Sequence, residues 1–80
     1  MSVKDAVVNR FISICKERNI KINELAVRSG VTASTAYSMM DCRRRDISIT
    51  TIKKFCDGLD ISLKDFFSSE EFDSLEQEIE

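Results

Sequence analysis

The sequence predicts an all-α fold of five helices, with a possible sixth at the C-terminal end. Apolar residues recur at the i, i+3, i+4 and i+7 spacing that gathers them on one face of a helix. Ser and Thr residues stand where capping would begin those helices. The 80 residues include no proline to interrupt them. A chain of this length is enough for one domain with a modest core.

The first two helices are predicted over residues 3–18 and 22–29. The first places four apolar residues at helical spacing: Val7, Phe11, Ile14 and Cys15. Asn19 can end it, because asparagine tolerates the left-handed backbone conformation. The second helix is expected to turn Leu25 and Ala26 inward.

A turn and a third helix follow directly. Gly30 suits the turn because it can adopt a positive φ without a Cβ clash. Thr32 can accept a hydrogen bond from the amides that open the next helix, predicted over residues 33–41. Ala36 and Met39 are expected inward. Two short helices joined in this way have the layout of a helix-turn-helix.

The fourth helix is predicted over residues 49–59, after the loop at residues 42–47. Ser48 caps it and Asp60 ends it. Its inward residues are expected to be Ile52, Phe55, Cys56 and Leu59.

A short fifth helix begins after Ser62, with Asp65 placed three residues on as a capping box requires. Its apolar residues are Leu63, Phe66 and Phe67. Ser68 and Glu71 could form another capping box and open a sixth helix. That helix would carry one apolar stripe, Phe72, Leu75 and Ile79, on an acidic surface.

The net charge of −2 conceals a segregation of charge. All 12 basic residues and 8 of the 14 acidic residues lie in residues 1–69, which leaves that part with a net charge of +4. The charged residues in the range 70–80 are all acidic. We therefore divide the chain into a body, residues 1–69, and an acidic tail, residues 70–80. A basic body beside an acidic tail is typical where one part meets a polyanion or the two parts meet each other.

Several function classes are disfavoured. The chain has no histidine, the commonest general base, and its two glycines cannot form a phosphate-binding loop. We expect no enzyme, no cofactor and no metal. Cys15 and Cys56 are expected in the core and Cys42 in an exposed loop, without disulfides. No apolar run is long enough to cross a bilayer and no signal peptide is evident, so a cytoplasmic protein is expected.

At this point the sequence resembles the Cro/phage-repressor helix-turn-helix family, also called the XRE type. The blocks that carry the resemblance are Glu24-Leu25-Ala26, Gly30-Val31-Thr32, Ser34-Thr35, Met39 and residues 49–67. The resemblance implies a five-helix lambda-repressor-like domain that binds specific double-stranded DNA, usually as a homodimer. It also implies a bacterial or phage-encoded transcriptional regulator, a repressor by expectation, with no small-molecule ligand.

The resemblance assigns the recognition helix to residues 33–41 and its base-reading positions to Ala33, Ser34, Tyr37 and Ser38. Ala33 can contact only a thymine methyl, whereas serine hydroxyls can donate to or accept from almost any base. Tyr37 reaches further, to a base or a phosphate. No bidentate Arg–guanine or Gln–adenine pair is available, so we expect modest specificity that depends on DNA shape.

Phosphate contacts are assigned to polar residues around this helix: Lys21, Asn23, Thr32, Thr35, Arg43, Arg44 and Arg45. Adjacent guanidinium groups repel one another, and a phosphate backbone would relieve that repulsion. The alternatives are a solvated loop, or pairing of these arginines with Asp41, with Asp46 or with the acidic tail.

The C-terminal apolar residues leave two possibilities open. Phe66 and Phe67 either close the core or form a dimer contact. Phe72, Leu75 and Ile79 would be costly to leave in water together, so they are expected to pack on the body, on a second copy or on a partner.

A second function stays open beside DNA binding. Ile22 stands where the family usually has a glutamine that contacts phosphate, and Ala33 where Arg, Gln or Lys is common. These departures and the negative total charge fit a protein-interaction module, such as an antirepressor or a complex subunit, that reuses the fold.

Overall fold

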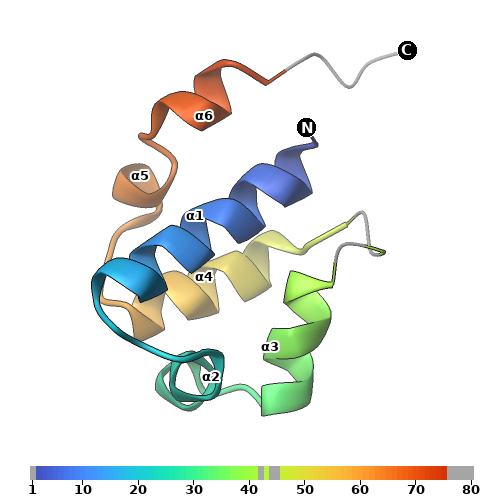
Figure 1. Cartoon of the computed structure of the whole chain (residues 1–80), viewed down its shortest axis with the longest axis vertical. Coiled ribbons are helices and arrows are strands. Elements are labelled where there is room, and N and C mark those ends of the chain that lie inside the picture. The colour runs from blue at the N-terminus through green and yellow to red at the C-terminus, as the bar shows by residue number, and fades with distance from the viewer. Residues whose placement is uncertain (1, 42, 44–45, 76–80) are drawn as a thin grey trace.

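The computed structural model describes residues 2–41, 43 and 46–75, and in this part of the chain the ordered elements are all helices (Figure 1). The six helices are α1 (Val3–Glu17), α2 (Ile22–Ser29), α3 (Ala33–Met40), α4 (Ile49–Gly58), α5 (Leu63–Phe66) and α6 (Glu70–Asp73). The predicted all-α class and the order of its helices are confirmed. None of the helices within the described ranges has the length and apolar character needed to span a membrane.

Side-chain caps open four of the helices. Thr32, Ser48 and Ser62 accept hydrogen bonds from backbone amides three residues on, at 3.1, 3.1 and 3.0 Å, as their positions predict. Ser2 does the same for α1, and its own amide donates to the Asp5 carboxylate at 3.3 Å, which completes a capping box. Hydrogen bonds from the backbone and side chain of Ser2 lower the pKa of the Asp5 carboxyl group.

Three residues in the left-handed conformation follow helices α1, α2 and α4. Asn19 has a φ of 56°, Gly30 of 71° and Asp60 of 58°. A left-handed residue turns the chain out of the helix so that the last carbonyl groups find donors. For example, the amides of Gly30 and Val31 donate to carbonyl groups in the last turns of α2. The helix ends predicted at these residues are confirmed.

The core is built around tilted aromatic rings from α1, α4 and α5 that pack against one another. Phe11 lies 5.5 Å from Phe55 and 4.3 Å from Phe66 between ring centroids, and all three side chains are fully buried. Cys15 and Cys56 are also buried, as predicted. Burial raises the pKa of the Cys56 thiol to about 11, so this thiol stays protonated at neutral pH. Cys42 lies outside the described residues.

The C-terminal helices α5 and α6 pack onto the body through phenylalanine rings, among them Phe66 of the core. Phe66 belongs to the core, whereas Phe67 and Phe72 are half-buried, with their ring centroids 4.9 Å apart. Phe72 also lies 5.9 Å from Phe66, which brings α6 against the body. Arg10 of α1 holds α5 against α1, because its guanidinium group donates a hydrogen bond to the carbonyl group of Phe66 at 3.0 Å.

The predicted start of the sixth helix is wrong by one residue. Ser69, not Ser68, precedes α6, and it makes no capping hydrogen bond. The Ser68 hydroxyl instead donates to the carbonyl group of Asp65 at 2.8 Å, because the end of α5 lies next to it. The helix ends at Asp73, so Leu75 follows it instead of continuing its stripe, and Ile79 lies outside the described residues.

Helices α2 and α4 approach each other closely at Gly58. A Cβ atom at this position would lie 2.9 Å from the carbonyl carbon of Arg28 and from the amide nitrogen of Ser29, and closer still to the Ser29 hydroxyl. The absence of a side chain at Gly58 therefore allows the end of α2 to rest directly on α4. This contact attaches the helix-turn-helix unit to the rest of the core.

Gly58→Ala is expected to destabilise the protein although alanine is the better helix former by about 1 kcal/mol. The added methyl group has to displace the backbone of α2, so we expect the free energy of unfolding to fall by about 1–3 kcal/mol. Urea denaturation followed by circular dichroism measures the change.

Gly30→Ala is the matched control for this prediction, because it is expected to destabilise the protein through backbone strain and not through a clash. Nothing lies within 4 Å of a Cβ atom at Gly30, but its φ of 71° strains any L side chain. Gly30→Asn should recover much of the alanine loss, because asparagine tolerates this conformation, whereas Gly58→Asn should be worse than Gly58→Ala. A Gly58→Ala protein more stable than the parent would contradict the close packing of α2 on α4.

Candidate nucleic-acid interface

A short turn joins α2 and α3. The two helices pack against each other through small and apolar side chains. The amide of Val31 donates to the carbonyl group of Ala26 at 3.1 Å, and that of Gly30 to the carbonyl group of Val27 at 3.2 Å. Leu25, Ala26 and Ala36 are buried between the helices. The opposite side of α3 therefore points away from the core.

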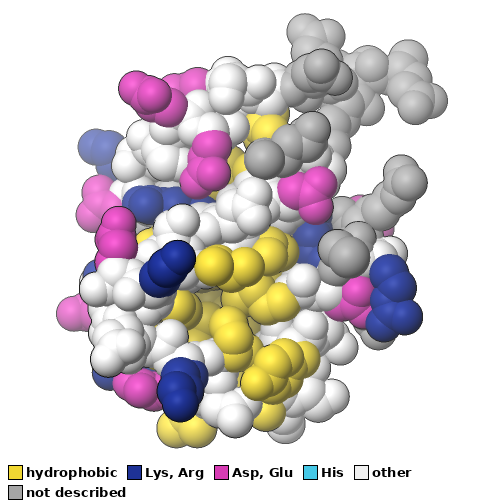
Figure 2. Space-filling view, in the orientation of Figure 1, with side chains coloured by type: hydrophobic (Ala, Val, Ile, Leu, Met, Phe, Trp, Pro, Cys, Tyr) yellow, Lys and Arg dark blue, Asp and Glu magenta, His cyan; other side chains and the backbone are white. Residues whose placement is uncertain are grey.

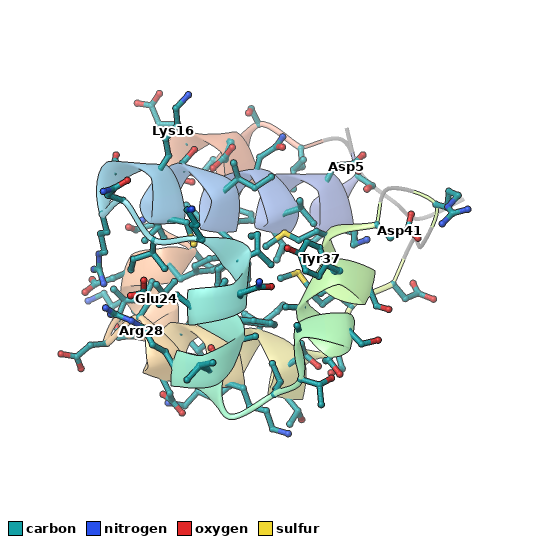
Figure 3. All side chains as sticks on the ribbon, turned by 60° about the horizontal axis from the view of Figure 1, so that its bottom comes forward. Asp5, Lys16, Glu24, Arg28, Tyr37 and Asp41 are labelled. Carbon is teal, nitrogen blue, oxygen red and sulfur yellow. The ribbon has the colours of Figure 1, made fainter. Side chains whose placement is uncertain are left out.

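The four residues predicted to read bases lie on α3, three of them exposed. Ala33, Ser34 and Tyr37 are exposed, and Ser38 is half-buried. Tyr37 is 55% exposed and stands at the surface beside α2 (Figure 3). These side chains are small apart from Tyr37, so this side of α3 is narrow and accessible.

The N-terminus of α3 is organised by two threonines. The Thr35 amide donates to the Thr32 hydroxyl at 3.1 Å, and the two hydroxyl oxygens lie 2.9 Å apart in a hydrogen bond. Both residues stay exposed at the end of the helix where the dipole is positive, which favours an anion. Lys21 and Asn23 are likewise exposed, at the start of α2. The structure thus brings these predicted phosphate contacts to the surface.

Arg43, the one residue of the predicted arginine cluster that the structure describes, is held by Asp41. Its Nε and Nη2 atoms donate to the two carboxylate oxygens of Asp41 at 3.1 and 2.9 Å, and its amide donates at 2.9 Å. The Arg43 side chain is nevertheless 87% exposed. For Arg43, the predicted alternative of pairing with Asp41 is the one seen. Arg44 and Arg45 lie outside the described residues.

Lys4 is a residue that sequence reasoning missed. It is only 3% exposed, and its Nζ atom donates to the backbone carbonyl group of Asp41 at 2.6 Å. A cation suits this place because Asp41 caps the C-terminal end of α3, where the helix dipole is negative. Lys4 therefore ties the end of α3 to the first turn of α1. Its position on the same face as Val7 and Phe11 is the signal that could have revealed it.

Other charges near α2 and α4 are paired on the surface. Arg28 lies 2.8 Å from the Glu24 carboxylate, and Lys53 pairs with Asp57. Such exposed pairs contribute little to stability. Within the described ranges, Lys16 and Lys21 take part in no ion pair, and no three His, Cys, Asp or Glu side chains are grouped as metal ligands.

The comparisons with known proteins agree with this geometry. The family model of the Cro/C1-type HTH DNA-binding domain matches residues 10–71 of this chain. The chain is similar to a solved structure described as the crystal structure of the prophage Lp1 protein 11, at 30% identity and a TM-score of 0.81. The match covers 94% of this chain and 100% of the other. None of the curated proteins matches the chain.

Lys4→Met is expected to loosen the end of α3 selectively. The variant keeps the buried aliphatic stem but removes the charged donor to the Asp41 carbonyl group, and hydrogen bonds of this kind contribute about 1.5–3 kcal/mol. Hydrogen exchange followed by NMR should show amides in the last turn of α3 exchanging about tenfold faster or more, since 1.4 kcal/mol is a factor of ten.

Lys16→Met is the control, because Lys16 is exposed on the same helix. It should leave exchange in α3 unchanged. Uniform acceleration over all helices in Lys4→Met would mean that Lys4 supports the whole fold and has no particular part at the end of α3.

Proposed function

The chain belongs to the Cro/C1-type helix-turn-helix DNA-binding domain family, and from this we propose that it is a transcriptional repressor that binds specific duplex DNA as a homodimer. In this proposal α3 enters the major groove. The observation that carries it is the uncovered side of α3, where Ala33, Ser34 and Tyr37 are exposed beyond a helix N-terminus capped by Thr32. The protein would act in the cytoplasm of a bacterium, encoded by the host or by a phage, without catalytic activity.

The exposed residues of α3 favour a particular kind of recognition. An α-helix fits the width of the major groove, and outward side chains at its N-terminal end then face base edges. Ala33 would pack on a thymine methyl, and Ser34 and Ser38 would bond to bases without strong preference. Tyr37 would reach across to a further base or to the backbone. Discrimination would then depend partly on DNA shape and deformability.

Backbone contacts would supply most of the affinity. Lys21 and Asn23 at the start of α2, and Thr32 and Thr35 at the start of α3, lie on the surface around the proposed reading residues. Arg43 is exposed enough for a phosphate to approach its guanidinium from solvent while Asp41 holds it. Each phosphate neutralised by a cation releases counterions, so binding should weaken steeply as salt rises.

The direct test is selection of bound duplexes from a random pool, followed by fluorescence anisotropy on the selected and a random duplex. The selected duplex should bind more tightly, with two chains per duplex by analytical ultracentrifugation. Affinity for both should fall steeply between about 50 and 200 mM salt. Absence of binding to any duplex at low salt would overturn the proposal.

Two substitutions distinguish a residue that contacts the DNA backbone from a residue that reads bases. Arg43→Ala should weaken the selected and the random duplex by the same factor and reduce the salt-dependence slope by about 0.9, the value for one lost phosphate contact. Ser34→Ala should leave the slope unchanged and alter the preference between the two duplexes. Identical effects from both substitutions would contradict these assignments. Arg44→Ala extends the comparison to the rest of the arginine cluster.

A further inference from the structure

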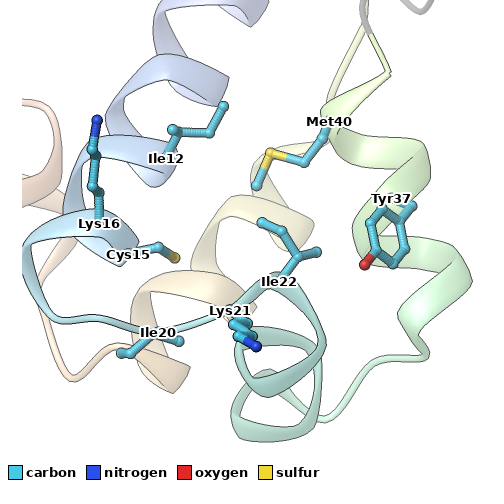
Figure 4. A pocket seen from close by; sticks show the side chains of 8 residues that line it. All are labelled: Ile12, Cys15, Lys16, Ile20, Lys21, Ile22, Tyr37 and Met40. Atoms are coloured by element: carbon cyan, nitrogen blue, oxygen red, sulfur yellow. The ribbon is translucent and has the colours of Figure 1, made fainter.

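An apolar groove with a volume of about 510 Å³ opens on the surface between α1, the start of α2 and α3. Its apolar lining residues are Ile12, Cys15, Ile20, Ile22, Tyr37 and Met40. Figure 2 shows apolar side chains gathered at the centre of this face. The close-up in Figure 4 shows Met40 and Tyr37 on the α3 side, across from Ile12 and Cys15 of α1.

The groove leaves part of its apolar lining exposed to water. Ile12 is 46% and Tyr37 is 55% exposed, and Ile22 and Met40 are half-buried between them. These side chains come from three different helices, α1, α2 and α3, yet together they line one groove. Contiguous apolar surface of this kind marks interaction sites more often than isolated exposed residues do.

One edge of the groove is basic. Lys16 and Lys21 complete its lining, and both stand on the side formed by α1 and the start of α2 (Figure 4). Neither forms an ion pair with a residue in the described ranges. No acidic residue lines the groove, and the nearby Glu24 carboxylate is taken by Arg28. The groove thus combines an apolar floor with positive charge along one margin.

We propose that this groove binds an acidic amphipathic helix of a partner protein. Such a helix presents apolar side chains at i, i+3, i+4 and i+7 to a groove of this shape. Its carboxylates, on one flank, lie along Lys16 and Lys21, while its other flank contacts Met40. A basic helix is disfavoured because it would place like charges beside the two lysines.

The groove shares Tyr37 with the side of α3 proposed to read bases. A helix seated in the groove covers this ring, so the partner and a duplex compete for the protein. This competition rests on the proposed DNA binding, whereas the docking of the helix does not. The partner would then act as an inhibitor of DNA binding.

The docking is tested with two synthetic helical peptides that share one leucine stripe, one with glutamate and one with lysine on its flanks. Each is titrated into the isotopically labelled full chain and followed by NMR. The glutamate peptide should shift the signals of Ile12, Ile22 and Met40. Ile12→Glu should abolish these shifts and Lys16→Glu should weaken binding several-fold. Val27→Glu, which changes an aliphatic side chain that is 80% exposed away from the groove, should leave binding unchanged.

Four outcomes would overturn the proposal. The first is equal binding of both peptides, which means that charge plays no part. The second is binding of decanoate without either peptide, which identifies a small-molecule site. The third is a shift of the same signals when the protein alone is concentrated, which identifies a second copy as the occupant. The fourth is the absence of any shift.

Competition is measured separately by adding the glutamate peptide to the complex with labelled duplex. Release of the duplex by the parent protein, but not by Ile12→Glu, supports competition. A peptide that binds without releasing the duplex overturns it. A protein that binds the peptide but no duplex at low salt contradicts the proposed function and leaves the docking site standing.

Discussion

The contact between α2 and α4 at Gly58 is the constraint on which the arrangement of the surface depends. The backbone of Arg28 and Ser29 rests where a side chain at Gly58 would be, so a larger residue at this position would have to displace the end of α2. The turn that begins at Gly30 then fixes α3 relative to α2. The contact at Gly58, this turn and the hydrogen bond from Lys4 to Asp41 together place the exposed side of α3 and the groove beside it.

Much of the fold could be predicted from local chemistry. Helix caps and left-handed residues interact only with neighbours a few residues away, so they can be predicted from the local sequence. Examples are the caps Thr32, Ser48 and Ser62 and the left-handed residues Asn19 and Asp60. Ser68 and Ser69 stand side by side before α6, so the local pattern did not determine which of the two precedes the helix. Which of the two precedes α6 depends on where Phe72 meets the core, and this is a tertiary contact.

The surface was harder to predict because its features also depend on tertiary contacts. Helical spacing places Lys4 on the inward face of α1, but its partner could not be predicted, because only the fold brings the end of α3 within reach of its ammonium group. The groove joins residues of three helices, so no single stretch of sequence indicates it. Residues 33–38 were predictable as a group because they lie on one short helix, where spacing alone determines which side chains share a side.

The placement of Tyr37 has a spectroscopic consequence. The chain has one tyrosine and no tryptophan, so nearly all of its intrinsic ultraviolet emission comes from a single phenol. That phenol lies on α3, lines the groove and is 55% exposed. The protein therefore carries an internal optical reporter whose quenching would register occupancy of this surface without any attached dye.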